Sequence, residues 1–181
     1  GVFVIIVDIC CKVNVFSASF ATFVIIVSTP MNRIRTILTA TACMIIAQGY
    51  AENFISEDVR IQNVTDSITL AGTISYPATD CPKAAIVLAS GSGAQNRDEE
   101  VMGHKPFKVL AEHLSGNGYA VLRMDDRGTG ESSGEFERAT TEDFRRDIMA
   151  GLEWMRKRFH DIPTGVIGHS EGGTIAIRSA A

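Results

Sequence analysis

The sequence has few aromatic residues, few cysteines and no excess of positive charge. Aromatic residues make up 7% of its 181 residues, and the formal net charge is −4. An acidic chain has no electrostatic reason to bind nucleic acid, because phosphate backbones attract basic surfaces. With 45% hydrophobic and 21% charged residues, the composition is that of an ordinary globular protein. It excludes a disordered or collagen-like chain and a strongly basic nucleic-acid-binding one.

Cysteine is scarce in the part of the chain that we expect to fold. Three of the four cysteines, Cys10, Cys11 and Cys43, precede residue 52, which leaves Cys81 alone after it. One cysteine cannot form an intrachain disulfide or a cysteine-based metal cluster. We therefore expect neither in this part of the chain, and the chemistry that its motifs predict requires no metal and no cofactor.

The first 51 residues are predicted to lie outside the folded domain. Residues 1–30 do not begin with methionine, and we interpret them as an upstream, non-native extension without structure of its own. Residues 31–51 have the layout of a secretory signal, with two arginines, an apolar run over 36–47 and small residues up to Ala51. That apolar run is short of the roughly 20 residues that span a bilayer. We expect a cleaved signal, a secreted or periplasmic protein and no stable membrane partner.

Two alternatives to a cleaved signal stay open. Residues 13–29 carry no charge and are just long enough for a short membrane anchor. A lipoprotein signal ending at Cys43 would place Ala40-Thr41-Ala42 before the cysteine. In each case the domain itself begins near residue 52.

Residues 52–181 have the pattern of an antiparallel hairpin followed by alternating strands and helices. Period-two alternation over 59–61 and 68–76 predicts the hairpin. Continuous apolar runs predict buried parallel strands at 84–89, 119–124 and 165–167. Helical spacing predicts helices over 107–114, after a Thr140 cap with Asp143, and from Thr174 onward. The predicted fold class is α/β, with a mostly parallel sheet and an N-terminal antiparallel hairpin.

The chemistry centres on Gly168-His169-Ser170-Glu171-Gly172, which fits the pattern G-x-S-x-G. In this nucleophile elbow a serine stands on a tight turn between a strand and a helix, in a strained backbone conformation. The residues two before and two after it must lack side chains that would collide, and Gly168 and Gly172 meet that demand. Ser170 is therefore the candidate nucleophile.

A serine nucleophile needs backbone donors for the oxyanion that develops during attack. One donor is expected to be the N–H of Glu171, the residue after the nucleophile. The second is expected from the loop after the strand 84–89, where Ser92 and Gly93 are the candidates. Without Ser170, the same Ser90-Gly91-Ser92-Gly93 would read as an ordinary turn at the end of a strand.

Four spaced motifs give the chain a resemblance to a known family. They are Ser90-Gly91-Ser92-Gly93 with Arg97-Asp98, Gly103-His104-Lys105-Pro106-Phe107, the loop from Asp125 to Ser132, and Gly168 to Gly173. Over residues 59–181 the sequence resembles the N-terminal half of an α/β-hydrolase, specifically the exported bacterial carboxylesterases related to the serine aminopeptidase group. It departs from many relatives in carrying Ser90-Gly91 where they carry His-Gly.

The resemblance implies a catalytic acid and then a histidine after the nucleophile in chain order. Apart from Glu171 beside the serine, no acidic residue or histidine follows Ser170. We therefore expect both groups beyond Ala181, and an inactive fragment with an unpaired apolar sheet edge. The four histidines before or beside the serine are interpreted as structural or surface residues: His104, His113, His160 and His169.

Other polar and aromatic residues are assigned structural roles. Asp125 and Asp126 follow the wrong strand for the triad acid of this fold, so we expect them to fix their loop and to pair with Arg127. Phe144 and Trp154 are interpreted as core residues of a helix and not as an acyl pocket.

The sequence predicts a serine hydrolase that cleaves small-molecule carboxylic esters through an acyl-enzyme on Ser170. A serine peptidase of the same fold is the alternative within enzymes, and a non-catalytic binding protein of this fold is the alternative outside them. A dinucleotide-binding domain fails because Asn96 stands where the third glycine belongs, and no helix is expected to begin there. The oligomeric state is left open.

Overall fold

The computed structural model describes residues 2–6 and 53–180, with side chains for 53–180. The predicted signal at 31–51, the possible anchor at 13–29 and Cys43 lie outside these residues. None of the helices in the described ranges combines the length and apolarity that crossing a bilayer requires.

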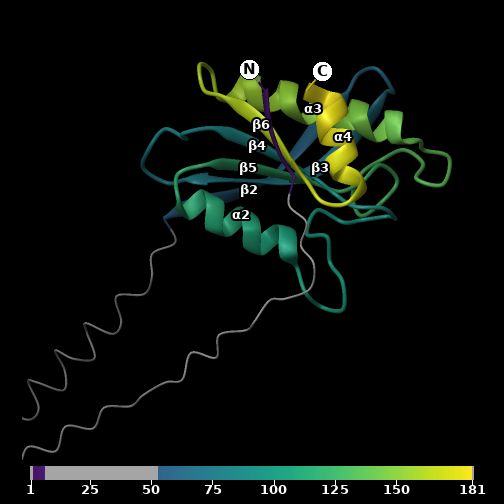
Figure 1. The fold of residues 1–181 in the computed structure, drawn as a ribbon, viewed down its shortest axis with the longest axis horizontal. Coiled ribbons are helices and arrows are strands. Elements are labelled where there is room, and N and C mark those ends of the chain that lie inside the picture. Colours follow the sequence, from purple (N-terminus) through teal and green to yellow (C-terminus); the bar gives the residue numbers. More distant parts are fainter. Residues whose placement is uncertain (1, 7–52, 181) are drawn as a thin grey trace, which may run out of the picture. The chain divides into compact units, whose positions relative to one another are not determined.

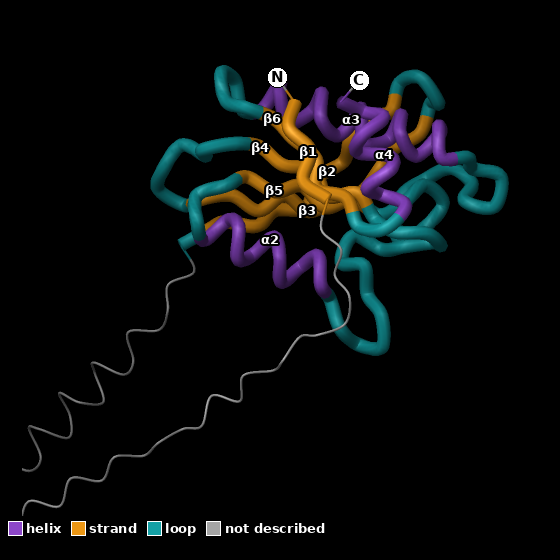
Figure 2. The backbone as a smooth tube through the Cα atoms, in the orientation of Figure 1, coloured by secondary structure: helices purple, strands orange, loops and turns teal. Residues whose placement is uncertain are grey.

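A six-stranded mixed sheet forms the centre of the described domain (Figures 1 and 2). Its strands lie in the order β1-β6-β4-β5-β3-β2. Their bounds are Val2–Ile6 (β1), Phe54–Asn63 (β2), Ile68–Pro77 (β3), Ala85–Ala89 (β4), Ala120–Met124 (β5) and Thr164–Gly168 (β6). The β2–β3 and β3–β5 pairs are antiparallel, and the other pairs are parallel. The predicted fold class, an α/β sheet with an antiparallel hairpin at its start, is confirmed.

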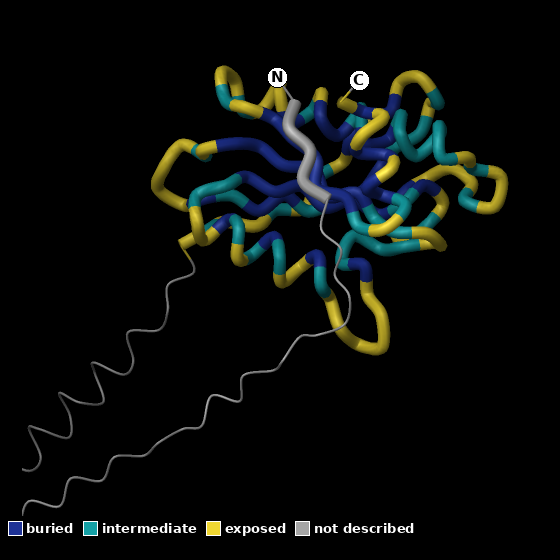
Figure 3. Tube along the Cα trace, in the orientation of Figure 1, coloured by how far each residue is buried: buried dark blue, intermediate teal, exposed yellow. Residues whose placement is uncertain are grey.

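Within residues 53–180, three helices cover the two faces of the sheet. They are α2 (Pro106–Gly116), α3 (Thr141–Arg158) and α4 (Glu171–Ala180). Because side chains alternate along a strand, β4 sends Val87 toward the core cluster of α3 and α4 and sends Ile86 and Leu88 toward the cluster of α2. Figure 1 shows the same separation, and Figure 3 shows the central strands as buried. Burial on both faces explains why these strands are continuous apolar runs.

Local signals in the sequence set the helix ends. Thr140 caps α3 in a capping box with Asp143, as predicted, since each side chain accepts from the other residue's backbone N–H. Asn117 follows α2, and Gly118 then takes a positive φ of 95° that glycine adopts easily. Helix α4 begins at Glu171, three residues earlier than the sequence pattern indicated, so the helix starts directly after Ser170.

The N-terminal segment differs from expectation at residues 2–6. These residues form β1, which pairs in parallel with β6 in the register Val4 to Val166. The expectation that residues 1–30 have no structure of their own is wrong for this stretch. Within residues 53–180 alone, the edge of β6 that β1 covers has no strand beside it, as expected for that part of the chain. An open parallel edge offers unpaired N–H and C=O groups, and an extended apolar segment can satisfy them.

Candidate active site

Ser170 stands at the junction between the end of β6 and the start of α4. Its φ is +53°, a value that residues other than glycine rarely adopt. The residue is exposed although the strand before it and the glycines after it are buried. The turn therefore presents the hydroxyl of Ser170 to solvent at the carboxyl end of the parallel strands, where sites of α/β folds lie.

The elbow can close only because glycine stands on both sides of the serine. A Cβ on Gly168 would lie 2.2 Å from the carbonyl oxygen of Gly172. A Cβ on Gly172 would lie 2.1 Å from the carbonyl oxygen of Ala89. Both separations are far below van der Waals contact, so the steric reason given for the motif holds in this turn.

The loop after β4, residues 90–95, lies against the elbow and is here called the oxyanion loop. A Cβ on Gly91 would be 3.3 Å from Cβ of Ser170, and the hydroxyl of Ser92 donates to Oε2 of Glu171 at 2.9 Å. Gly93 lines the same cavity as Glu171. The structure thus brings the predicted oxyanion residues Ser92, Gly93 and Glu171 together beside the candidate nucleophile.

The backbone N–H groups of Ser92, Gly93 and Glu171 donate to no other residue within 53–180. The N–H group of Glu171 also lies in the first turn of α4, where the helix dipole favours negative charge. By contrast, the N–H of Gly91 donates to a carboxylate, Oε1 of Glu99, at 2.8 Å. The free N–H groups have the chemistry that an oxyanion requires.

Asp126, in the loop after β5, holds the two ends of the oxyanion loop. Its Oδ1 accepts from the hydroxyl of Ser90 at 2.7 Å, and its Oδ2 accepts from the N–H of Gln95 at 2.9 Å. Burial raises the pKa of Asp126 to about 6, although both hydrogen bonds act to lower it. The expectation that Asp126 fixes its own loop is wrong, because its carboxylate binds the loop after β4, whereas Asp125 does bind within its own loop through the N–H of Glu131.

The carboxylate of Asp125 binds Arg97, which follows the oxyanion loop by two residues. The guanidinium donates from Nε and Nη2 to the two carboxylate oxygens at 3.1 and 2.7 Å, and Nη1 reaches Asp58 of β2 and the carbonyl of Gly72 in β3, each at 3.2 Å. Nη2 also donates to Glu131 at 2.8 Å. Burial acts to raise the pKa of Asp125, but the hydrogen bonds from Arg97 and from the Glu131 N–H outweigh it, so the pKa is lowered.

Arg127 does not pair with Asp125 or Asp126, and that expectation is wrong. Its Nε donates to Asp147 of α3 at 2.7 Å, and its Nη2 donates to Asp66 at 2.7 Å. Successive residues of this loop project in different directions, so Arg127 is buried beneath α3. Burial raises the pKa of Asp147 more than its hydrogen bonds from Arg127 and Asn63 lower it.

The histidines take the structural and surface positions that were expected. His104 forms a backbone bridge with Val101, His113 lies in the last turn of α2, and His160 is exposed after α3. His169 binds Glu99 through Nδ1 at 2.8 Å. No group of three or more potential metal-ligating side chains gathers within residues 53–180.

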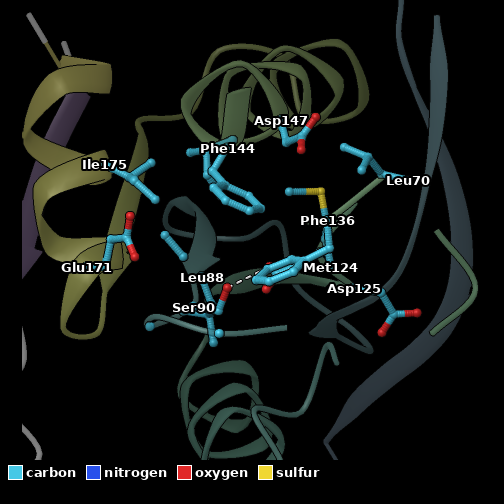
Figure 4. A pocket seen from close by; sticks show the side chains of 15 residues that line it. Leu70, Leu88, Ser90, Met124, Asp125, Phe136, Phe144, Asp147, Glu171 and Ile175 are labelled. Atoms are coloured by element: carbon cyan, nitrogen blue, oxygen red, sulfur yellow. Dashed lines mark hydrogen bonds between the residues drawn. The ribbon is translucent and has the colours of Figure 1, made fainter. Parts of the chain in front are cut away.

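A cavity of about 60 Å³ opens beside the oxyanion loop. Its lining residues include Ser90 and Gly93 of the loop, Glu171 and Ile175 of α4, and Phe144 of α3 (Figure 4). Phe144 also packs against the core, as expected. Trp154 packs against the core and does not line the cavity.

The sequence of this chain matches a known protein family. A family model described as serine aminopeptidase, S33, matches residues 80–181. Human monoglyceride lipase is 36% identical over 109 residues, which cover 59% of this chain and 33% of that protein. Esterase EstD of Thermotoga maritima is 28% identical over 124 residues, which cover 68% of this chain and 29% of that protein. This chain therefore spans about a third of the length of these curated relatives.

Solved structures agree with the family match. An esterase of Pyrococcus furiosus superposes with a TM-score of 0.57 and 27% identity, covering 71% of this chain and 46% of that one. A serine hydrolase without a lid from Xanthomonas campestris superposes with a TM-score of 0.55 at 21% identity over 69% of this chain and 55% of that one, a likeness that concerns the fold alone.

Proposed function

We propose that this chain, which belongs to the serine aminopeptidase family of α/β serine hydrolases, cleaves carboxylic esters through an acyl-enzyme on Ser170. The observation that carries the proposal is the strained, exposed Ser170 beside backbone N–H groups that have no partner among the described residues. Two relatives whose names denote action on esters, monoglyceride lipase and an esterase, support an ester as substrate.

The proposed reaction begins when Oγ of Ser170 attacks the ester carbonyl carbon and loses its proton to a base. The carbonyl oxygen becomes an oxyanion that accepts hydrogen bonds from the N–H of Glu171 and from Ser92 or Gly93. Collapse of the tetrahedral intermediate breaks the C–O bond, and the alcohol leaves with a proton. Water then hydrolyses the acyl-enzyme and restores the serine. The base and its acid are proposed to come from sequence beyond residue 181.

A small acyl group suits the cavity beside the oxyanion loop. Its volume is about 60 Å³, and Leu88, Phe144 and Ile175 give it apolar walls beside the carboxylates of Asp125, Asp126 and Asp147. We therefore propose small-molecule esters with short acyl chains as the substrate class. Peptide hydrolysis is the competing activity, since acyl transfer from an amide uses the same machinery.

The test compares nitrophenyl acetate with aminoacyl nitroanilides in the full-length protein. We expect turnover of the ester, its loss in S170A, and labelling by a fluorophosphonate that S170A abolishes. S133A, which changes an exposed serine elsewhere, is the control and should keep both turnover and labelling. Preference for the nitroanilide would favour a peptidase, and absence of labelling would favour a binding protein.

We also propose export, on the basis of the signal layout at residues 31–51. The N-terminal sequence of the protein from a periplasmic fraction should begin near Glu52. Protein retained in the membrane fraction with residues 13–29 intact would favour the anchor instead.

A further inference from the structure

Glu99 is a buried carboxylate in the loop between β4 and α2 that nothing in the catalytic motif predicts. Its relative exposure is 3%, and its Oε1 accepts two hydrogen bonds of 2.8 Å. One comes from the N–H of Gly91 in the oxyanion loop, and the other comes from Nδ1 of His169 in the elbow. The second hydrogen bond therefore pairs Oε1 of Glu99 directly with the ring of His169.

This carboxylate joins the two halves of the site at their point of contact. His169 directly precedes Ser170, and the space where a Cβ of Gly91 would stand is 3.3 Å from Cβ of Ser170 and 3.2 Å from Nδ1 of His169. A single oxygen of Glu99 therefore fixes Gly91 against the nucleophile turn. With the N–H of Gly91 occupied by Glu99, the next two N–H groups of the loop, those of Ser92 and Gly93, are left for the substrate.

The position of Glu99 is unfavourable for folding. Its φ is +51°, and its second oxygen, Oε2, is buried with no hydrogen-bond partner among the described residues. The neighbouring loop holds it there, since Oδ1 of Asn96 accepts from the N–H groups of Asp98 and Glu100, and Asp98 binds Arg123. Strained backbone and unpaired buried polar atoms concentrate at functional sites, because the surrounding structure sustains them there.

We propose that Glu99 is a positioning residue for ester hydrolysis, which fixes the oxyanion loop on the Ser170 elbow before substrate binds. The inference rests on the proposed function, since it concerns the same oxyanion. Donors that are already oriented stabilise the transition state more than the bound substrate. Loss of Glu99 should therefore lower kcat and leave KM nearly unchanged.

The test replaces Glu99 in the full-length protein and measures kcat and KM on nitrophenyl acetate. E99M keeps the volume of the side chain and removes both acceptors, whereas E99Q keeps an oxygen that can accept from Gly91. E100M is the matched control, because Glu100 is the next residue and pairs with Lys105 near the surface. Titration with a fluorophosphonate gives the concentration of reactive serine, so that kcat is expressed per active site.

We expect E99M to lower kcat about 10- to 100-fold with KM within threefold, a smaller loss than removal of a direct oxyanion donor. E99Q should recover most of that loss, and E100M should match the wild type. H169F tests the same link from the elbow side without altering the buried position, and should lower kcat at least threefold even if E99M fails to fold.

The outcomes separate this inference from the proposed function. If S170A abolishes turnover but E99M and H169F keep the wild-type kcat per labelled serine, the positioning role is wrong and the hydrolase remains. If E99M reduces only the number of labelled serines, Glu99 is merely structural and the inference is also overturned. If the wild type neither hydrolyses the ester nor reacts with the fluorophosphonate, the proposed function itself fails.

Discussion

The hydroxyl of Ser90 donates a 2.7 Å hydrogen bond to Oδ1 of Asp126, which joins the loop after β4 to the loop after β5. The carboxylate is buried enough that its pKa rises from 3.8 to about 6. Ionisation of Asp126 is therefore harder in the folded protein than in the unfolded chain, where the group has its ordinary pKa.

The pH dependence of stability follows from the sign of this shift. Between pH 4 and 6 the folded state binds more protons at Asp126 than the unfolded state, so its contribution to stability is lost as the pH rises through this range. Relative to D126N, the wild type should lose up to about 2 kcal/mol of unfolding free energy between pH 4 and 7. Urea unfolding of both proteins across this range measures it. Parallel stability curves for the two proteins would contradict the raised pKa.

G172A should prevent the elbow from closing. The added methyl group would lie 2.1 Å from the carbonyl oxygen of Ala89, which is backbone and cannot rotate away. We expect a loss of about 3 kcal/mol or more of unfolding free energy, or no soluble protein. G116A is the control, because Gly116 ends α2 and has open space at its Cβ. Its melting temperature should stay the same or rise, since alanine favours a helix.

R127A should destabilise the protein by leaving a buried carboxylate unpaired. The side chains of Arg127 and Asp147 are each only 8% exposed. Removal of one member of such a pair costs about 3–5 kcal/mol, because the remaining charge stays buried. R138A removes an arginine that is 86% exposed and that, within residues 53–180, pairs only with Glu135, and it should change stability by less than about 0.5 kcal/mol. Chemical unfolding of the two variants tests the contrast, and equal losses would argue against it.

F144A should enlarge the cavity beside the oxyanion loop and shift chain-length preference. We expect the ratio of kcat/KM for octanoate to that for butyrate nitrophenyl esters to rise several-fold, at a cost of about 2 kcal/mol in stability. F159A makes the same deletion where the ring packs on Tyr76 and does not line the cavity. It should destabilise the protein and leave the ratio unchanged. If the ratio is unchanged in F144A as well, the cavity does not bind the acyl chain of the substrate.

The elements that the sequence predicted are those with local signals. The apolar runs of β4 to β6 gave the parallel strands, and Thr140 with Asp143 marked the start of α3 through neighbours three residues apart. The elbow was equally accessible, because its steric demand falls on two glycines within the motif. Each of these features depends on residues close together in the sequence.

The contacts that the sequence did not reveal depend on distant residues or on the direction of a side chain. Ser90 and Asp126 are 36 positions apart, and the partners of Arg127 lie in α3 and in the turn of the first hairpin. The sequence from Asp125 to Ser132 does not indicate which segment of the protein each of its charged side chains contacts. Glu99 directly follows the motif residues Arg97-Asp98, but only the folded loop shows that it is buried. Strand β1 was missed because no local signal selects the edge of β6 for it.

The hydrogen bonds of the Arg97 guanidinium affect which amino-acid substitutions the protein tolerates. Through it, Asp58 and Gly72 of the first hairpin share a hydrogen-bond network with Asp125 in the loop after β5. Asp58 is 79% exposed and lies on an outer strand, a place where replacements usually pass unnoticed. A mutational scan scored by hydrolysis should nonetheless show reduced activity for Asp58 variants. The residues required for activity would then include one on the outer strand of the first hairpin.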